Sequence, residues 1–155
     1  MRAFLYECAN EYTENESMKT KHYLTLEDAE FLLNQAHAYA IENGFNVSIA
    51  VTDETGSLLA MKRMDGASPM TSNLSLEKAK CSAMSQCPSK LFEDLIKGGQ
   101  MGFLTMDSFS GMLEGGEPIL YEGQLVGALG VSGGKSFQDA EIAQQAIKLF
   151  LAQVA

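Results

Sequence analysis

The segment from Gly115 to Gly134, GGEPILYEGQLVGALGVSGG, decides the fold of this chain and holds seven of its 14 glycines. Glycine inside an apolar strand packs poorly and carries an entropic penalty. It is tolerated best where the chain bends or where another body approaches the backbone closely. The segment ends at Ser132-Gly133-Gly134, just before an expected helix. We therefore expect a sheet with close-approach gaps and a glycine loop that serves a ligand or a partner.

Two hairpins are expected from the pattern of strands and turns. Within the glycine-rich segment, Glu122-Gly123 forms a two-residue turn between strands over 118–121 and 124–131. Upstream, apolar residues alternate from Val47 to Val51, the sequence 53–56 (DETG) reads as a turn, and Ser57 to Met64 forms the returning strand. Hairpins imply antiparallel pairing.

The second strand of the later hairpin has two predicted faces. One carries Leu125, Leu129 and Val131, and the other carries Val126, Ala128, Gly130 and Ser132. A further short strand is expected to begin over 111–113.

Helices are expected before, between and after the hairpins. Thr25 with Asp28 resembles a capping box, and Ser136 with Asp139 repeats that pattern. The predicted helices are Leu26–Asn43, Ser75–Met84, Lys90–Ile96 and a last one from Ser136 to about Gln153. The order helix, hairpin, helices, hairpin, helix predicts an α+β domain with helices packed against an antiparallel sheet.

Length and charge limit the classes of function. The 155 residues suit one domain, and we place it at residues 22–155 after a peripheral extension over residues 1–21. The net charge of -9, without a Lys/Arg cluster, argues against nucleic acid and against anionic membrane surfaces. No apolar run reaches the roughly 20 residues that a membrane helix needs.

The N-terminus and the cysteines point to the cytoplasm. The first residues lack a basic start followed by a long apolar core, so we expect no secretory signal. Three cysteines, Cys8, Cys81 and Cys87, are an odd number without metal-site spacing, which is typical of reduced thiols in a cytoplasmic protein.

Several of these markers, in this order, resemble the GlcG/HbpS family, which includes the C-terminal domain of PduO-type proteins. They are 51–56 (VTDETG), 63–67 (RMDGA), Gly115-Gly116 with Pro118, and 126–134 (VGALGVSGG) with Asp139. The resemblance covers about residues 24–154. It implies a profilin/Roadblock-like layered domain with about five antiparallel strands, assembled into homo-oligomers such as dimers or larger rings. It also implies a link to haem, a related tetrapyrrole or cobalamin metabolism, or to glycolate and diol utilisation.

Two histidines are the candidate axial ligands of a haem iron, because a neutral imidazole ligates iron well. His37 lies at the edge of the apolar stripe of the first helix, and His22 stands at the start of the domain. The alternative is a partly exposed helix residue for His37 and ordinary surface for His22. Cys87-Pro88 is a weaker thiolate candidate, and Cys81 reads as a small core residue.

The loop Ser132-Gly133-Gly134 is a candidate anion site, since free backbone N–H groups before a helix hold a carboxylate or phosphate. A haem propionate or a small acid would suit it, and a plain strand-to-helix turn is the alternative. Arg63 is a candidate clamp for a ligand carboxylate. The alternative is that Arg63 and Asp65 hold the end of the hairpin by pairing with each other or with the backbone. Asp53 and Asp65 read as turn residues.

No nucleophile–base pair and no paired Cys/His metal set is visible in the sequence. Three hypotheses therefore remain open. The first is a binding protein for haem or a related tetrapyrrole. The second is an enzyme or accessory protein acting on a small organic acid or aldehyde. The third is an assembly module without a ligand.

Overall fold

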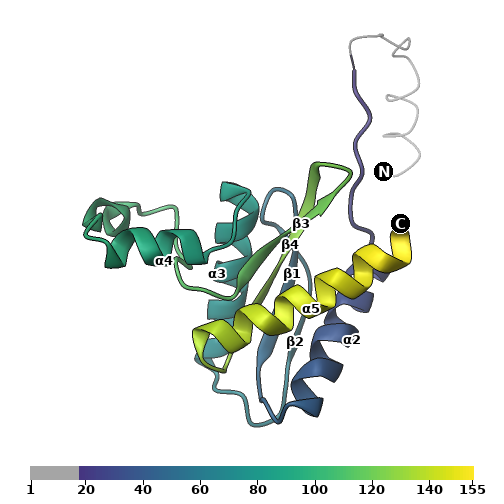
Figure 1. The fold of residues 1–155 in the computed structure, drawn as a ribbon, viewed down its shortest axis with the longest axis horizontal. Coiled ribbons are helices and arrows are strands. Elements are labelled where there is room, and N and C mark those ends of the chain that lie inside the picture. Colours follow the sequence, from purple (N-terminus) through teal and green to yellow (C-terminus); the bar gives the residue numbers. More distant parts are fainter. Residues whose placement is uncertain (1–17) are drawn as a thin grey trace, which may run out of the picture.

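The computed structural model describes residues 18–155, and Figure 1 shows their arrangement. Most of the expected extension, and Cys8 with it, lies outside the described residues. The elements are α2 (Leu26–Glu42), β1 (Ser48–Asp53), β2 (Leu58–Arg63), α3 (Met70–Ser85), α4 (Lys90–Lys97), the 3₁₀ helix η1 (Met101–Thr105), β3 (Gly116–Tyr121), β4 (Gln124–Ser132) and α5 (Ser136–Val154).

The strands form one antiparallel sheet in the order β2-β1-β4-β3. Helices α2 and α5 pack together on one face and α3 covers the other (Figure 1). The predicted α+β class is thus confirmed, as is each hairpin. Between α2, α5 and the sheet lies the main core, whose largest fully buried side chains include Leu32, Ile49, Leu129 and Ile142.

Four strands occur within residues 18–155, one fewer than the expected number. The segment 111–113 is not a strand. Backbone groups at the end of this segment bond to side chains at α4 and not to a neighbouring strand. The Leu113 carbonyl accepts a hydrogen bond from the Ser89 hydroxyl. The next amide, of Glu114, donates to the Glu93 carboxylate at 2.6 Å.

Helix α3 lies directly against the glycine-rich strands. Gly116, Gly130 and Ala50 stand side by side across β3, β4 and β1, and we call this row the glycine trough. A Cβ atom on Gly130 would lie 2.0 Å from the Ser75 carbonyl oxygen, and one on Gly116 would lie 2.1 Å from the Lys78 carbonyl oxygen. The body that approaches these glycines is therefore the backbone of α3.

Helix α3 begins at Met70, earlier than the expected Ser75. Pro69 precedes it in a helical conformation, with φ of -53°. Proline is pre-set for this position and its missing N–H costs nothing in the first turn of a helix. The Ser68-Pro69 pair therefore starts the helix, where the sequence had suggested a connecting loop.

The predicted face of Val126 is wrong. Ile119 pairs with Gly127, but Leu120 pairs with Leu125, so β4 carries one extra residue at this point. Such a bulge turns the side chain of the extra residue out of strict alternation. Val126 consequently joins Leu129 and Val131 in the core beneath α2 and α5.

Both predicted capping boxes can be compared with the structure. Thr25 and Asp28 cap α2 reciprocally, as expected. The second box is wrong in its residues: α5 begins at Ser136, and Lys135 N donates to the Gln138 side chain at 2.9 Å. Asp139 is instead drawn toward α3, as described below.

Glu117 on β3 is a buried carboxylate beneath α5. Burial raises its pKa, partly opposed by the Gln144 side-chain amide, which donates to Glu117 Oε1 at 3.1 Å, and Glu114 raises it further. The folded protein therefore holds the Glu117 proton more tightly than the unfolded chain does. The free energy of unfolding falls as pH rises from the pKa of Glu117 in the unfolded chain through its higher pKa in the folded protein.

We expect Glu117→Gln to raise the melting temperature at neutral pH, because it removes a desolvated charge and keeps an acceptor for Gln144. At a pH below the ordinary range of a glutamate pKa the gain should vanish. Thermal unfolding across pH measures this, and a gain that does not change with pH would contradict the assigned cause.

Candidate functional site

Lys78 of α3 and Asp139 of α5 form an ion pair beside the end of β4. Lys78 Nζ lies 2.9 Å from Asp139 Oδ2, and both side chains are only 3% exposed. Lys78 Nζ also donates to the Val131 carbonyl at 3.0 Å, and the Gly134 amide donates to Asp139 Oδ1 at 2.8 Å. This network fixes the loop Ser132-Gly133-Gly134 between α3 and α5.

A cavity of about 300 Å³ opens beside this network, and we call it the polar cavity. Its floor contains the ion pair, and its walls come from the start of α3, the end of β4 and the start of α5. The lining residues are Ser68, Met70, Thr71, Leu74, Lys78, Leu113, Ser132, Gly133, Gly134, Ser136 and Asp139. The structure thus brings the predicted loop to a cavity, together with a lysine that sequence reasoning missed.

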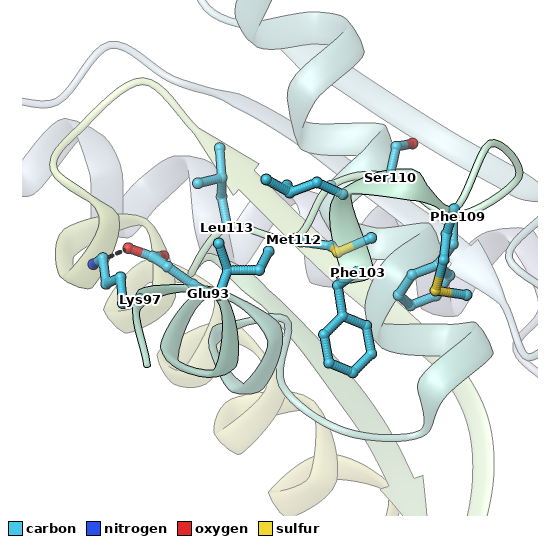
Figure 2. Close-up of a pocket in the computed structure, with 11 residues that line it drawn as sticks. Glu93, Lys97, Phe103, Phe109, Ser110, Met112 and Leu113 are labelled. Carbon is cyan, nitrogen blue, oxygen red and sulfur yellow. Dashed lines mark hydrogen bonds and ion pairs between the residues drawn. The ribbon is translucent and has the colours of Figure 1, made fainter. Parts of the chain in front are cut away.

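A larger cavity of about 490 Å³ lies between α4 and the segment 103–113, and Figure 2 shows its lining. We call it the apolar pocket. Its lining residues are Glu93, Ile96, Lys97, Phe103, Leu104, Met106, Phe109, Ser110, Gly111, Met112 and Leu113. Phe92 supports it, since its ring meets those of Phe103 and Phe109 edge-on, at centroid distances of 5.4 Å and 5.0 Å.

Charge at the apolar pocket is confined to one ion pair, Glu93 with Lys97, one turn apart on α4 (Figure 2). Burial tends to raise the pKa of Glu93. The hydrogen bonds from Lys97 and the Glu114 amide outweigh burial and hold that pKa below its usual range. The carboxylate is therefore ionised and paired, and the remaining lining is almost wholly apolar.

His22 lies at a third and smaller cavity, of about 180 Å³, with Leu24, Val126 and Phe150 among its walls. Its Nε2 is 3.2 Å from Glu122 Oε2, and its ring meets that of Tyr121 edge-on at 4.9 Å. The imidazole itself is exposed.

His37 is half-buried on α2 and lines none of these three cavities. Arg63 is exposed at the end of β2, where its Nε donates to the Ala67 carbonyl at 3.3 Å. Arg63 and Ser132 both pair with Ser48 of β1, so Arg63 and the glycine loop lie at the same end of the sheet, two strands apart. The two histidines lie elsewhere, with His22 at a cavity of its own.

The two described cysteines are both free. Cys81 is buried in α3, and burial together with the neighbouring Cys87 raises the pKa of its thiol to about 12, so it remains a neutral core residue. Cys87 is half-buried and its thiol donates to the Ser85 hydroxyl. Among residues 18–155, no group of three or more His, Cys, Asp or Glu side chains is placed to hold a metal ion. No helix in the same range is long and apolar enough to cross a membrane.

The apolar pocket had little signal in the sequence. Residues 100–110 show no helical or strand periodicity, and their phenylalanines and methionines come together only because η1 and the following loop fold back over α4 (Figure 1). Lys78 did leave a signal: it is a charged residue on the small-residue face of α3, beside Ser75, Ala79 and Ser82.

A comparison with models of protein families identifies the family of this chain. A model described as haem degrading protein HbpS-like matches residues 24–148. The chain belongs to the HbpS-like family. Protein GlcG of Escherichia coli K12 is 39% identical over 115 residues, which span 74% of this chain and 85% of GlcG. An uncharacterized 15.0 kDa protein in the dhaT-dhaS intergenic region of Citrobacter freundii is 31% identical over 130 residues, 82% of this chain and 92% of that protein.

Several solved structures share the same architecture. Klebsiella pneumoniae ORFY superposes with a TM-score of 0.81 at 29% identity, covering 91% of this chain and 99% of ORFY. A PduOC:heme complex gives a TM-score of 0.73 at 26% identity, over 82% of this chain and 94% of PduOC. Streptomyces reticuli HbpS, as a double mutant, gives the same score and identity, over 93% and 95%. The resemblance stated from the sequence is thereby confirmed.

Proposed function

We propose that this HbpS-like protein binds haem or a related tetrapyrrole, with the macrocycle in the apolar pocket. Two findings support the ligand class: membership of the HbpS-like family and the structural likeness to a PduOC:heme complex. The position of the macrocycle is inferred from the pocket itself, because its lining and volume suit a flat apolar molecule.

The volume and lining of the apolar pocket fit a macrocycle better than those of the other cavities. At about 490 Å³ it lies within the range of roughly 300–1,000 Å³ usual for ligand sites. The cavity at His22, about 180 Å³, lies below that range. Ile96, Phe103 and Leu104 provide apolar surface that leaves water when a macrocycle binds, which is the main favourable term for such a ligand.

The polar requirements of haem are met by few groups. Met106 and Met112 offer thioether sulfurs, which ligate iron in some haem proteins, and the sulfur of Met112 is visible in the pocket in Figure 2. Lys97 stands at the rim, and although one of its N–H groups pairs with Glu93, the ammonium has further donors for a propionate. A bound haem would supply the redox and ligand-exchange chemistry of its iron. The chain's own residues would exclude water from the macrocycle and set its orientation.

Haemin titration of the purified protein tests this proposal. We expect a saturable shift of the Soret band, and at least tenfold weaker binding for Leu104→Asp, which brings a negative charge to the wall of an apolar site for a dianionic ligand. Leu104 is 60% exposed, so the fold should tolerate the change. Leu149→Asp is the matched control, because Leu149 is a similarly exposed leucine on α5 that does not line the pocket.

The histidines form the second arm of the same experiment. The double variant His22→Ala, His37→Ala should keep the Soret shift if the macrocycle lies in the apolar pocket. Loss of the shift in this variant, with Leu104→Asp unaffected, would place the macrocycle at a histidine and contradict the pocket. Absence of any saturable shift in the native protein would contradict haem binding itself.

We further propose that the protein acts in the cytoplasm as a homo-oligomer. Contiguous exposed apolar surface marks sites of association, and large apolar side chains are exposed on several elements of this chain. They include Met84 on α3, Leu91 on α4, Leu120 on β3 and Phe137 on α5.

A further inference from the structure

We propose that the outer edge of β2 pairs with the same edge of a second copy of this chain, so that two sheets join into one. The inference rests on the proposed homo-oligomer and adds to it the surface and the register of one contact. The sheet order β2-β1-β4-β3 leaves two outer strands, and the backbone of only one of them, β3, is protected against further pairing.

The outer edge of β3 is closed by its own chain. The Gly116 amide donates to the Ser89 hydroxyl at 2.9 Å, and the Gly116 carbonyl accepts from the Ser89 amide at 2.9 Å. Pro118, the next residue on that side of the strand, has no N–H to offer. Proteins close sheet edges by such devices, because an open edge pairs with other chains.

The outer edge of β2 lacks this protection. The Met64 amide donates to the Val47 carbonyl, on the β1 side, at 3.0 Å. Since inward and outward groups alternate along an antiparallel strand, the amides and carbonyls of Met61 and Arg63 point away from β1. Hydrogen bonds between residues 18–155 engage none of these four groups, and the strand contains no proline. Such an edge is a ready template for another strand.

Two identical edges can pair antiparallel, and the side chains of β2 favour a register centred on Met61. The amide and carbonyl of Met61 then bond those of Met61 in the second copy, and Lys62 lies opposite Ala60. The next register toward Arg63 would set Lys62 directly against Lys62, and like charges in that position destabilise a sheet. A shift the other way reaches the irregular pairing between Leu58 and Ala60.

The two cations of β2 do not close its edge, although charged side chains protect many edges. Lys62 Nζ bonds to the Asn34 side chain of α2, and Arg63 Nε donates to the Ala67 carbonyl at 3.3 Å. Both charges are thus directed to groups of their own chain. The centre of the edge, at Met61, is uncharged and half-buried, which suits a contact with a second copy.

The mass in solution of the full-length chain tests this contact. Met61→Pro removes the outward amide, and proline is tolerated on an edge strand whose N–H faces away from its neighbour, so the fold should persist. We expect the mass of the native oligomer to fall by at least half in this variant. Met61→Thr keeps the amide and should keep the native mass, which makes it the matched control. A native mass in Met61→Pro would overturn this contact alone, whereas a monomeric native protein would contradict the homo-oligomer as well.

Disulfide trapping tests the register without relying on the proline variant. It uses a background with Cys8→Ser and Cys87→Ser, in which the remaining Cys81 is buried. Two Met61→Cys chains would bring their Cα atoms to about 5.5 Å, within the range that a disulfide bridges. Two Arg63→Cys chains would be displaced by four residues, roughly 13 Å along the strands, so they should link at least about tenfold more slowly. No link at Met61→Cys, or equal rates at both positions, would overturn the proposal.

Discussion

Gly130→Ala is expected to destabilise the protein by at least about 3 kcal/mol, the upper range for a residue too large for its site. The added methyl group would lie 2.0 Å from the Ser75 carbonyl oxygen and 2.7 Å from the Ala79 amide nitrogen. Both atoms belong to the backbone of α3, so no side-chain rotation relieves the clash. The helix would have to move off the sheet, which would open the core on that face.

Gly102→Ala is the matched control, because a Cβ atom at Gly102 meets nothing within 4 Å. Urea unfolding of both variants measures the difference. A Gly130→Ala protein with native stability would mean that α3 does not rest on the glycine trough, and would contradict the packing described for this sheet.

Lys78→Met is expected to cost about 3–5 kcal/mol, since it leaves the Asp139 carboxylate buried without its partner. The double variant Lys78→Met, Asp139→Asn should recover much of this loss. It removes the second charge and keeps an oxygen that accepts from the Gly134 amide. Equilibrium unfolding of the single and double variants gives the coupling between the two side chains.

An exposed ion pair provides the comparison for Lys78. Lys90 and Asp94 lie 3.2 Å apart on α4 with about half of each side chain exposed, so Lys90→Met should change stability by less than about 1 kcal/mol. If Lys78→Met is as mild as Lys90→Met, the buried network does not hold α3 to α5, and the polar cavity would lose its fixed floor.

The glycines of residues 115–134 show what a sequence can and cannot specify. Their number and position predicted a close approach to the sheet, and this was right. The approaching helix was not predictable, because α3 ends at Ser85, about 30 residues before β3 begins at Gly116, and only the completed sheet brings Ser75 to Gly130. Local patterns identify a gap in packing, whereas its occupant depends on tertiary arrangement.

The predictions for Asp139 and Val126 were wrong for related reasons. Asp139 has the spacing of a capping residue, but a buried lysine from another element offers its carboxylate a stronger partner. Val126 follows strict alternation in the sequence, and a bulge that depends on the pairing with β3 moves it to the other face. Of the residues that line the two larger cavities, only Ser132, Gly133 and Gly134 of the polar cavity were predictable from the sequence. The walls of both larger cavities come from residues without local periodicity or from distant helices.

The most direct measurement of the proposed function is an amide NMR spectrum of the protein with substoichiometric haemin, whose paramagnetic iron broadens nearby resonances. We predict that broadening begins at Phe103, Phe109 and Met112, and that residues around His22 and His37 stay sharp. Broadening that begins at either histidine, or none at any residue, would contradict a tetrapyrrole site in the apolar pocket.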